Sequence, residues 1–210
     1  MDSEALAGLL EIDQAELKAT LEAQPPDVKE AFLAELSELE LSLNENPLQT
    51  YFPHPKQKLF HAATERRRAF FAGSRTGKST AGIADDLIQL LPPGWVPKHL
   101  MAYKRHGHDG PIKARIITPN LTHTMEVATD KVRRFCPPAA LLGGKWEKAF
   151  DKQRRILRFD RGDSLDFMST EQDPSAFGGV DLHQVHFDEE PSGPNSWRCL
   201  LYTSPSPRDS

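Results

Sequence analysis

The sequence lacks several features that mark whole classes of protein. No apolar run approaches the ~18–20 residues that a membrane-spanning helix needs. The acidic N-terminal stretch has neither the basic region nor the apolar segment of a secretory signal peptide. Only two cysteines are present, Cys136 and Cys199, which is too few for a disulfide framework and favours a reducing compartment. We therefore do not expect a membrane, secreted or collagen-like protein.

A large excess of charge of one sign is also missing. The 210 residues include 26 Lys and Arg and 30 Asp and Glu, and this net charge of -4 by itself argues against nucleic-acid binding. The charge is unevenly distributed, because residues 1–45 hold 12 acidic and two basic residues, a net charge of -10. The remaining 165 residues must then carry +6 to give the total of -4. An acidic head masks a mildly basic body, so the net charge does not exclude a nucleic-acid partner.

Residues 1–46 are predicted to form an acidic helical extension. Leucines between positions 6 and 21 recur near helical spacing, and after Pro25-Pro26 a second apolar pattern runs from position 28 to 39. The sequence Asn44-Glu45-Asn46-Pro47 ends the second helix. We expect a helical hairpin that packs on the body, and a docking element for a partner protein is the alternative.

The body, residues 47–198, alternates strand-like and helix-like stretches. This alternation predicts an α/β fold, a parallel sheet flanked by helices. The segment 92–112 is rich in Pro, Gly and His and is predicted to be an exposed loop. Strands are predicted at 69–72, 114–118, 155–159, 164–168 and 185–187, helices at 81–91 and 125–135, and a hairpin turn at 161–163.

The last residues do not fit the composition of the body. Residues 199–209 match, residue for residue, the translation of a DNA-sequencing library adapter, and a genuine Ser/Pro-rich linker is the alternative. We interpret residues 199–210 as an adapter-derived artefact and expect them to be disordered. Residues 47–198 would then be an incomplete N-terminal domain of a longer protein.

The segment 72–80, with the sequence AGSRTGKST, has the composition of a phosphate-binding loop. It lies between a predicted strand and a predicted helix, which is the context that such a loop requires. Gly73 and Gly77 let backbone N–H groups curl around an anion, and the helix N-terminus that follows adds positive potential. Lys78 would reach the β- and γ-phosphates, and the Ser79 hydroxyl would ligate Mg²⁺. The segment begins with alanine where the consensus has glycine, and a Gly-rich turn without a ligand is the alternative.

A second acidic element follows the strand predicted at 185–187. An Asp at the carboxyl end of a strand can hold Mg²⁺, and the next carboxylate can polarise a water molecule for attack on the γ-phosphate. Asp188 is the predicted metal ligand and Glu189 the predicted base. The strand itself is unusually polar, because His183, Gln184 and His186 interrupt the apolar run. A solvated acidic turn is the alternative.

Two further residues are candidates for nucleotide contacts. Gln57 can offer a donor and an acceptor to an adenine edge, with Phe52 or Tyr51 as an apolar wall. A Pro-stiffened linker with one polar residue is an equally good interpretation. Arg75 within the loop could contact γ-phosphate charge or form a surface ion pair.

Other residue groups carry weaker signals. The His and Cys residues lack the spacing of a zinc site. The runs at 66–68 and 133–134 are basic and could contact a phosphate backbone, but such short runs usually form solvated faces.

Taken together, these motifs resemble the ATPase part of a tailed-phage terminase large subunit, the motor that packages viral DNA. The resemblance covers residues 47–198 and rests on the order and spacing of four segments. These are Phe52-Pro53-His54-Pro55-Lys56-Gln57, Gly73-Ser74-Arg75-Thr76-Gly77-Lys78-Ser79, Phe177-Gly178-Gly179-Val180 and Phe187-Asp188-Glu189-Glu190-Pro191.

The resemblance implies a P-loop ATPase of the additional-strand type with ATP and Mg²⁺ as ligands. Gln57 would recognise adenine, Arg75 would sense the γ-phosphate, Ser79 and Asp188 would hold Mg²⁺, and Glu189 would activate water. The phosphates would be cradled by Gly73, Ser74, Arg75, Thr76, Gly77, Lys78, Ser79 and Thr80.

The same resemblance implies partners and a setting. Hydrolysis by the intact parent would drive double-stranded DNA into a procapsid in the host cytoplasm. The motor would be a homo-oligomeric ring on the portal protein, assisted by the terminase small subunit. A helicase-type P-loop ATPase and a non-hydrolysing packaging adaptor are the alternatives.

Overall fold

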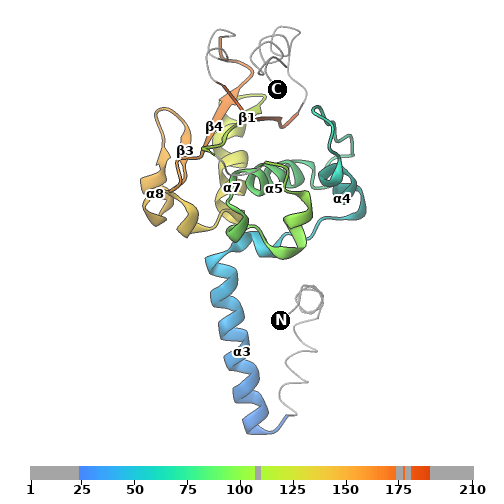
Figure 1. Ribbon diagram of the computed structural model, residues 1–210, viewed down its shortest axis with the longest axis vertical. Coiled ribbons are helices and arrows are strands. Elements are labelled where there is room, and N and C mark those ends of the chain that lie inside the picture. Colours follow the sequence, from blue (N-terminus) through green and yellow to red (C-terminus); the bar gives the residue numbers. More distant parts are fainter. Residues whose placement is uncertain (1–23, 107–109, 174–176, 178–180, 190–210) are drawn as a thin grey trace.

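The computed structural model describes residues 24–106, 110–173, 177 and 181–189. The first helix of the predicted acidic extension and the predicted adapter-derived tail lie outside the described residues. Among the motif residues, positions 178–180 and 190–191 also lie outside them. Within the described ranges the protein is α/β, with helices packed against a mixed sheet (Figure 1).

The sheet of the described part has five strands in the order β2-β3-β4-β1-β5. The three strands β4, β1 and β5 are parallel, whereas β2 and β3 join antiparallel at one side. The sheet is therefore mixed: its core is parallel as predicted, and the predicted hairpin adds antiparallel strands at one side. The strand bounds are β1 Lys113–Thr118, β2 Phe150–Asp151, β3 Ile156–Arg158, β4 Ser164–Ser169 and β5 Gln184–Phe187.

The predictions at 114–118, 155–159, 164–168 and 185–187 are confirmed to within a few residues. In β1 every residue after Lys113 is buried, because both faces of this central strand are covered. The turn between β3 and β4 contains Gly162 at φ 91°, a backbone conformation that favours glycine. Local chain chemistry was sufficient to identify these elements.

Helix α5, Lys78–Leu90, runs through the centre of the body (Figure 1). Every residue from Ala81 to Leu90 is buried, and Ile83, Leu87 and Ile88 belong to the main hydrophobic core. A short helix, a π-helical turn and α7 follow β1 and cover the region of the predicted helix 125–135. The other helix bounds are α3 Pro26–Glu45, α4 Pro55–Ala62, α6 Leu121–His123, the π-helical turn Thr124–Ala128, α7 Thr129–Phe135 and α8 Trp146–Ala149.

The strand predicted at 69–72, directly before the phosphate loop, is not formed. Residues 68–73 have no regular secondary structure, and the Phe71 side chain is 91 % exposed. Phe70 stacks on Phe60 of α4 at 5.4 Å between ring centroids, and the Arg68 guanidinium lies over the same ring at 4.8 Å. Aromatic contacts to α4, rather than pairing with a strand, hold this segment. The prediction was wrong because a short apolar run does not say what it will pair with.

The loop predicted to be exposed at 92–112 is partly built into the core. Two 3₁₀ turns, Pro93–Trp95 and Lys98–Tyr103, place Val96 and Leu100 among buried residues. Lys104 Nζ donates hydrogen bonds to the carbonyl oxygens of Ile88 and Gln89, at 2.9 Å each, where α5 ends. The segment therefore covers the last turn of α5, and the expectation of an exposed loop was wrong for these residues.

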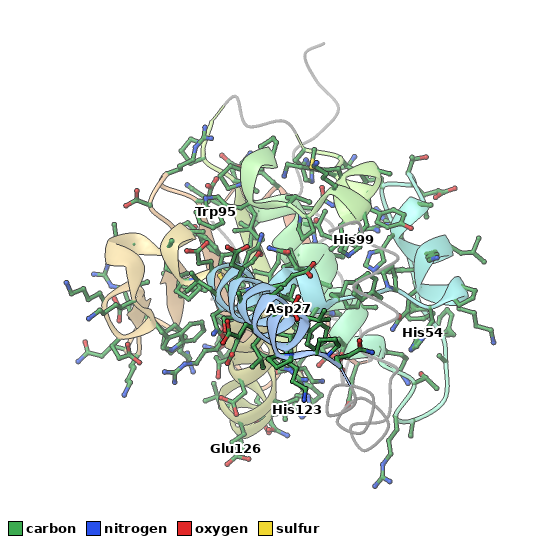
Figure 2. All side chains as sticks on the ribbon, turned by 90° about the horizontal axis from the view of Figure 1, so that it is seen from below. Asp27, His54, Trp95, His99, His123 and Glu126 are labelled. Atoms are coloured by element: carbon green, nitrogen blue, oxygen red, sulfur yellow. The ribbon has the colours of Figure 1, made fainter. Side chains whose placement is uncertain are left out.

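Helix α3 confirms the second helix of the acidic extension but not its packing. It projects away from the body (Figure 1), and none of its residues is buried. In the view from below, α3 is seen nearly end-on, with Asp27 in its first turn (Figure 2). The chain joins the body just after α3, where Asn46 Nδ2 donates to the Trp95 carbonyl oxygen at 2.8 Å and Leu48 is fully buried. The predicted packing of this helix along the body is therefore wrong.

None of the helices in the described ranges is both long enough and apolar enough to cross a bilayer.

Candidate functional site

A cavity of about 1270 Å³ opens where the predicted phosphate loop faces the segment that leads into α4. Its walls come from the start of α4, the loop before α5, the chain around the end of α3, and the end of α7. Five of the predicted nucleotide contacts in the loop and the predicted adenine contact share this cavity. These lining residues are Gln57, Gly73, Arg75, Thr76, Gly77 and Thr80. A cavity of this size is large enough to admit a small-molecule ligand.

The loop is held in a curled conformation by its own side chains. Lys78 Nζ donates to the carbonyl oxygens of Ala72, at 2.6 Å, and Gly73, at 2.8 Å. Thr76 Oγ1 also donates to the Gly73 carbonyl oxygen, at 2.8 Å. The ammonium group of Lys78 therefore lies inside the bend of the loop, which is where the charge of a bound phosphate would be balanced.

Gly77 is the residue that turns the loop into α5. Its φ is 78°, in the left-handed region, and its carbonyl oxygen accepts the first hydrogen bond of the helix, from Ala81 N at 2.9 Å. A Cβ at this position would lie only 2.9 Å from Gln57 Nε2. Both the backbone conformation and the neighbouring side chain therefore demand glycine.

We expect Gly77→Ala to lower the free energy of unfolding by about 1–2 kcal/mol, because an L side chain is strained in the left-handed region. The variant should also displace Gln57 from the loop. Gly94→Ala is the matched control, since a Cβ at Gly94 would meet open space. Urea denaturation of both variants tests this, and equal stability of the two would contradict it.

Gln57 is almost fully buried, with both ends of its amide engaged. Its Oε1 accepts a hydrogen bond from His54 N at 2.8 Å, as part of a capping box at the start of α4. Its Nε2 donates to the Gly77 carbonyl oxygen at 3.2 Å. Gln57 thus ties α4 to the phosphate loop, a role that its position in the sequence did not reveal. The predicted adenine contact stays a prediction.

The aromatic residues beside Gln57 have separate partners. Phe52 stacks on His99 at 4.7 Å and lines the cavity. Tyr51 is buried, and its hydroxyl lies 2.8 Å from His61 Nε2. Burial, with the nearby Asp85 charge, raises the pKa of the Tyr51 hydroxyl far above its usual range. Both rings line the cavity, but the Tyr51 hydroxyl is already engaged with His61, whereas Phe52 is only half-buried.

Arg75 and Ser74 lie at the exposed tip of the loop. Arg75 lines the cavity and has φ 60°, an uncommon conformation for a residue with a side chain. Ser79 and Thr80 are half-buried in the first turn of α5, and Thr80 faces the cavity. The loop thus presents cationic and hydroxyl groups on the side from which a ligand would enter.

Asp188 lies directly after β5 and is buried, with an exposed fraction of 5 %. Its backbone N–H donates to the Ile117 carbonyl oxygen at 2.9 Å, and its Oδ2 lies 3.4 Å from His123 Nε2. Glu189 is exposed and has φ 110°, a strained conformation outside glycine. Neither carboxylate lines the cavity described above. Sequence spacing offered no signal for His123, which α6 brings to this position.

The contacts between β5 and α5 show toward which end of α5 the chain leads when it reaches Asp188. Gln184 Nε2 donates to Asp86 Oδ1 at 2.5 Å, and the ring of His186 lies against Gly82, one turn nearer the start of α5. The strand and the helix therefore run antiparallel. Residues 184, 186 and 188 share one face of the extended chain, so Asp188 continues toward the first turn of α5, where Ser79 lies. This direction fits the predicted pair of magnesium ligands.

A buried ion cluster lies behind the loop. Asp85 of α5 binds His61 Nδ1 at 3.1 Å, Arg68 Nη2 at 2.7 Å and Arg105 Nη2 at 2.6 Å. Burial raises the pKa of Asp85, but hydrogen bonds from these three partners outweigh it and hold the pKa well below its usual range. The cluster joins α4, the segment before the loop and the segment after α5. Arg68 therefore does not belong to a solvated face, and that interpretation was wrong for this residue, whereas Arg66 and Arg67 are exposed.

The remaining candidates from the sequence have simpler surroundings. Arg133 pairs with Glu147 at 2.9 Å on the surface, and Arg134 lines the cavity. Cys136 is buried, and burial raises the pKa of its thiol far above the usual range. The described part of the chain contains no group of three His, Cys, Asp or Glu side chains placed to hold a metal ion.

Comparisons of the chain with protein-family models, with curated proteins and with solved structures each found no match.

Proposed function

We propose that this chain binds Mg·ATP in the cavity beside the phosphate loop and belongs to the ATPase motor of a viral terminase large subunit. The observation that carries the proposal is that Gln57 and five residues of the 73–80 loop line one cavity, while Ser74, Lys78 and Ser79 of the same loop are not part of its lining. A loop of this composition, followed by the N-terminus of a buried helix, offers amides, a lysine and hydroxyls to an anion. ATP hydrolysis would be the activity of the intact parent.

Each residue has a role in the proposed reaction. Lys78 would leave the carbonyl oxygens of its own loop for the phosphates, and Ser79 and Asp188 would hold Mg²⁺. When bound, Mg²⁺ would supply positive charge to the phosphate oxygens. Arg75 would contact the γ-phosphate. Glu189 would accept the proton of the attacking water, with its exposed position leaving room for that water.

The finer assignment of fold and partners belongs to the same proposal. The parallel core β4-β1-β5 with α5 packed on it supports an α/β fold, whereas residues 68–73 before the loop form no strand, and the P-loop ATPase of the additional-strand type is our proposal. The partners we propose are double-stranded DNA, a portal protein and a terminase small subunit, with several copies in a ring. The setting would be the host cytoplasm.

Replacing Lys78 by alanine tests the proposed site. We expect Mg·ATP binding to weaken about 10- to 100-fold, because a hydrogen-bonded charge contributes about 1.5–3 kcal/mol. Lys58→Ala is the matched control, since Lys58 is an exposed lysine of α4 outside the 73–80 loop. Titration calorimetry with Mg·ATP provides the measurement.

Three outcomes of the titration would argue against the proposal. A wild-type chain without Mg·ATP affinity would contradict it outright. Undiminished affinity in Lys78→Ala would show that ATP binds elsewhere. Equal losses in Lys78→Ala and Lys58→Ala would indicate nonspecific attraction of the nucleotide to positive charge.

A further inference from the structure

We propose that His186 is a positioning residue: held by Asp86 against the bare backbone of Gly82, it sets how closely the carboxylates after β5 approach the phosphate loop. This inference rests on the proposed function, because it concerns how Asp188 reaches the Mg²⁺ of bound Mg·ATP. It adds three residues to that site that its motifs do not contain.

The first observation is a buried polar contact between β5 and α5. His186 Nδ1 lies 2.7 Å from Asp86 Oδ2, and Gln184 Nε2 donates to Asp86 Oδ1 at 2.5 Å. Asp86 is fully buried, so both of its oxygens depend on these two side chains of β5. Burial lowers the pKa of His186, but the adjacent Asp86 carboxylate outweighs it and raises that pKa overall. The polar residues that weaken β5 as an apolar strand are therefore the ones that attach it to the helix.

The second observation is the absence of a side chain at Gly82. A Cβ at this position would lie 2.3 Å from His186 Cε1 and 2.4 Å from His186 Nε2. The imidazole therefore packs directly on the backbone of α5, closer than any other residue type at position 82 would permit. A glycine inside a helix costs about 1 kcal/mol relative to alanine, so its presence in this buried helix needs such a reason.

The third observation is the distance along the chain from this contact to the proposed metal ligands. Asp188 comes two residues after His186 on the same face of the strand, about 7 Å farther along. Ser79 comes three residues before Gly82, about 4.5 Å along the helix axis. Because strand and helix run antiparallel, both ligands lie on the same side of the His186 contact. A shift of the imidazole would therefore change the spacing between Ser79 and Asp188.

A purely structural role makes a different prediction. If His186 only satisfied a buried carboxylate, its loss would lower stability and leave the linkage between Mg²⁺ and ATP unchanged. A positioning role requires that Mg²⁺ strengthens ATP binding less in the variant than in the wild type. The diagnostic quantity is the ratio of ATP affinities with and without Mg²⁺, measured on folded protein.

The experiment measures ATP binding to the whole chain in excess Mg²⁺ and in EDTA. For His186→Ala we expect the affinity in EDTA to stay within about twofold of wild type, and the tightening by Mg²⁺ to fall about tenfold. His186→Gln can still donate a hydrogen bond to Asp86 and should recover part of that tightening. His183→Ala is the control, since His183 is exposed and lies on the same segment.

Gly82→Ala provides an independent variant that keeps both members of the pair. Its methyl group would displace the imidazole, so it should reproduce the loss of Mg²⁺ linkage, and it replaces His186→Ala as the test if that variant does not fold. Unchanged linkage in a folded His186→Ala or Gly82→Ala, or a wild type in which Mg²⁺ does not alter ATP affinity, overturns this inference. A wild type that binds no ATP at all would instead overturn the proposed function.

Discussion

Replacing Asp85 by alanine is expected to lower the free energy of unfolding by about 3–5 kcal/mol, more than any other single substitution considered above. The carboxylate is 2 % exposed and is shared by His61, Arg68 and Arg105. Its removal would leave two guanidinium groups, 15 % and 21 % exposed, without their buried partner. The loss of stability arises because these charges are left unpaired at partly buried positions, rather than because one contact is lost.

Urea denaturation of Asp85→Ala beside Asp160→Ala measures this effect. Asp160 is exposed, so its loss should change stability by less than about 0.5 kcal/mol. Asp85→Asn should lie between them, because the amide oxygen can still accept one hydrogen bond. Equal stability of Asp85→Ala and Asp160→Ala would show that the cluster does not hold α4 and the loop segment on α5.

The same cluster predicts a pH dependence of a definite sign. The pKa of Asp85 is lower in the folded protein than its unfolded value of about 3.9, so its contribution to stability is fully present above that value. The contribution is lost as the pH falls below about 4 toward the folded pKa. The stability difference between wild type and Asp85→Ala should therefore shrink between about pH 5 and pH 2.

Replacing Glu189 by glutamine is expected to slow ATP hydrolysis by about 10²–10⁴-fold in the intact parent, because the amide cannot accept the proton of the attacking water. The affinity of this chain for Mg·ATP should stay within about twofold, since the substitution preserves size and leaves the loop untouched. The Glu189 side chain is exposed and does not pack in the core, so packing does not account for its φ of 110°. A strained backbone without a packing role favours a functional role for this residue.

Single-turnover phosphate release, measured beside Mg·ATP titration, separates binding from chemistry for this variant. Glu171→Gln is the matched control, because Glu171 is an exposed glutamate in the turn after β4. Undiminished hydrolysis in Glu189→Gln would remove this residue from the reaction. A wild-type parent that neither binds nor hydrolyses Mg·ATP would favour the non-hydrolysing adaptor over the motor.

Those parts of the fold that depend on neighbours in sequence could be predicted. The β3–β4 hairpin follows from two short apolar runs around Gly162, and α5 follows from a glycine-ended loop and a continuous apolar stretch. The strand expected at 69–72 is not formed, and Phe70 stacks on Phe60 of α4 instead. Strand propensity describes a segment, whereas a strand also needs another segment to pair with.

In the candidate site, too, local features could be predicted from the sequence, whereas contacts between different elements could not. The residue types of the 73–80 loop and their spacing predict an anion-binding loop, because the backbone geometry of such a loop is local. The sequence could not show that Gln57 binds the Gly77 carbonyl oxygen, or that His123 lies beside Asp188. Each of these contacts joins side chains from different elements, and no spacing rule connects them.

By itself, then, the sequence determined the α/β class and the place of the acidic pair after a strand, and it predicted a phosphate loop before α5, because local backbone chemistry specifies each of them. Only the tertiary structure decided that β5 is attached to α5 through His186, Gly82 and Asp86. It also decided that α3 projects from the body instead of packing along it. The physical reason is that the contact between His186 and Asp86 joins residues about a hundred positions apart. Such residues come together only when the whole domain packs.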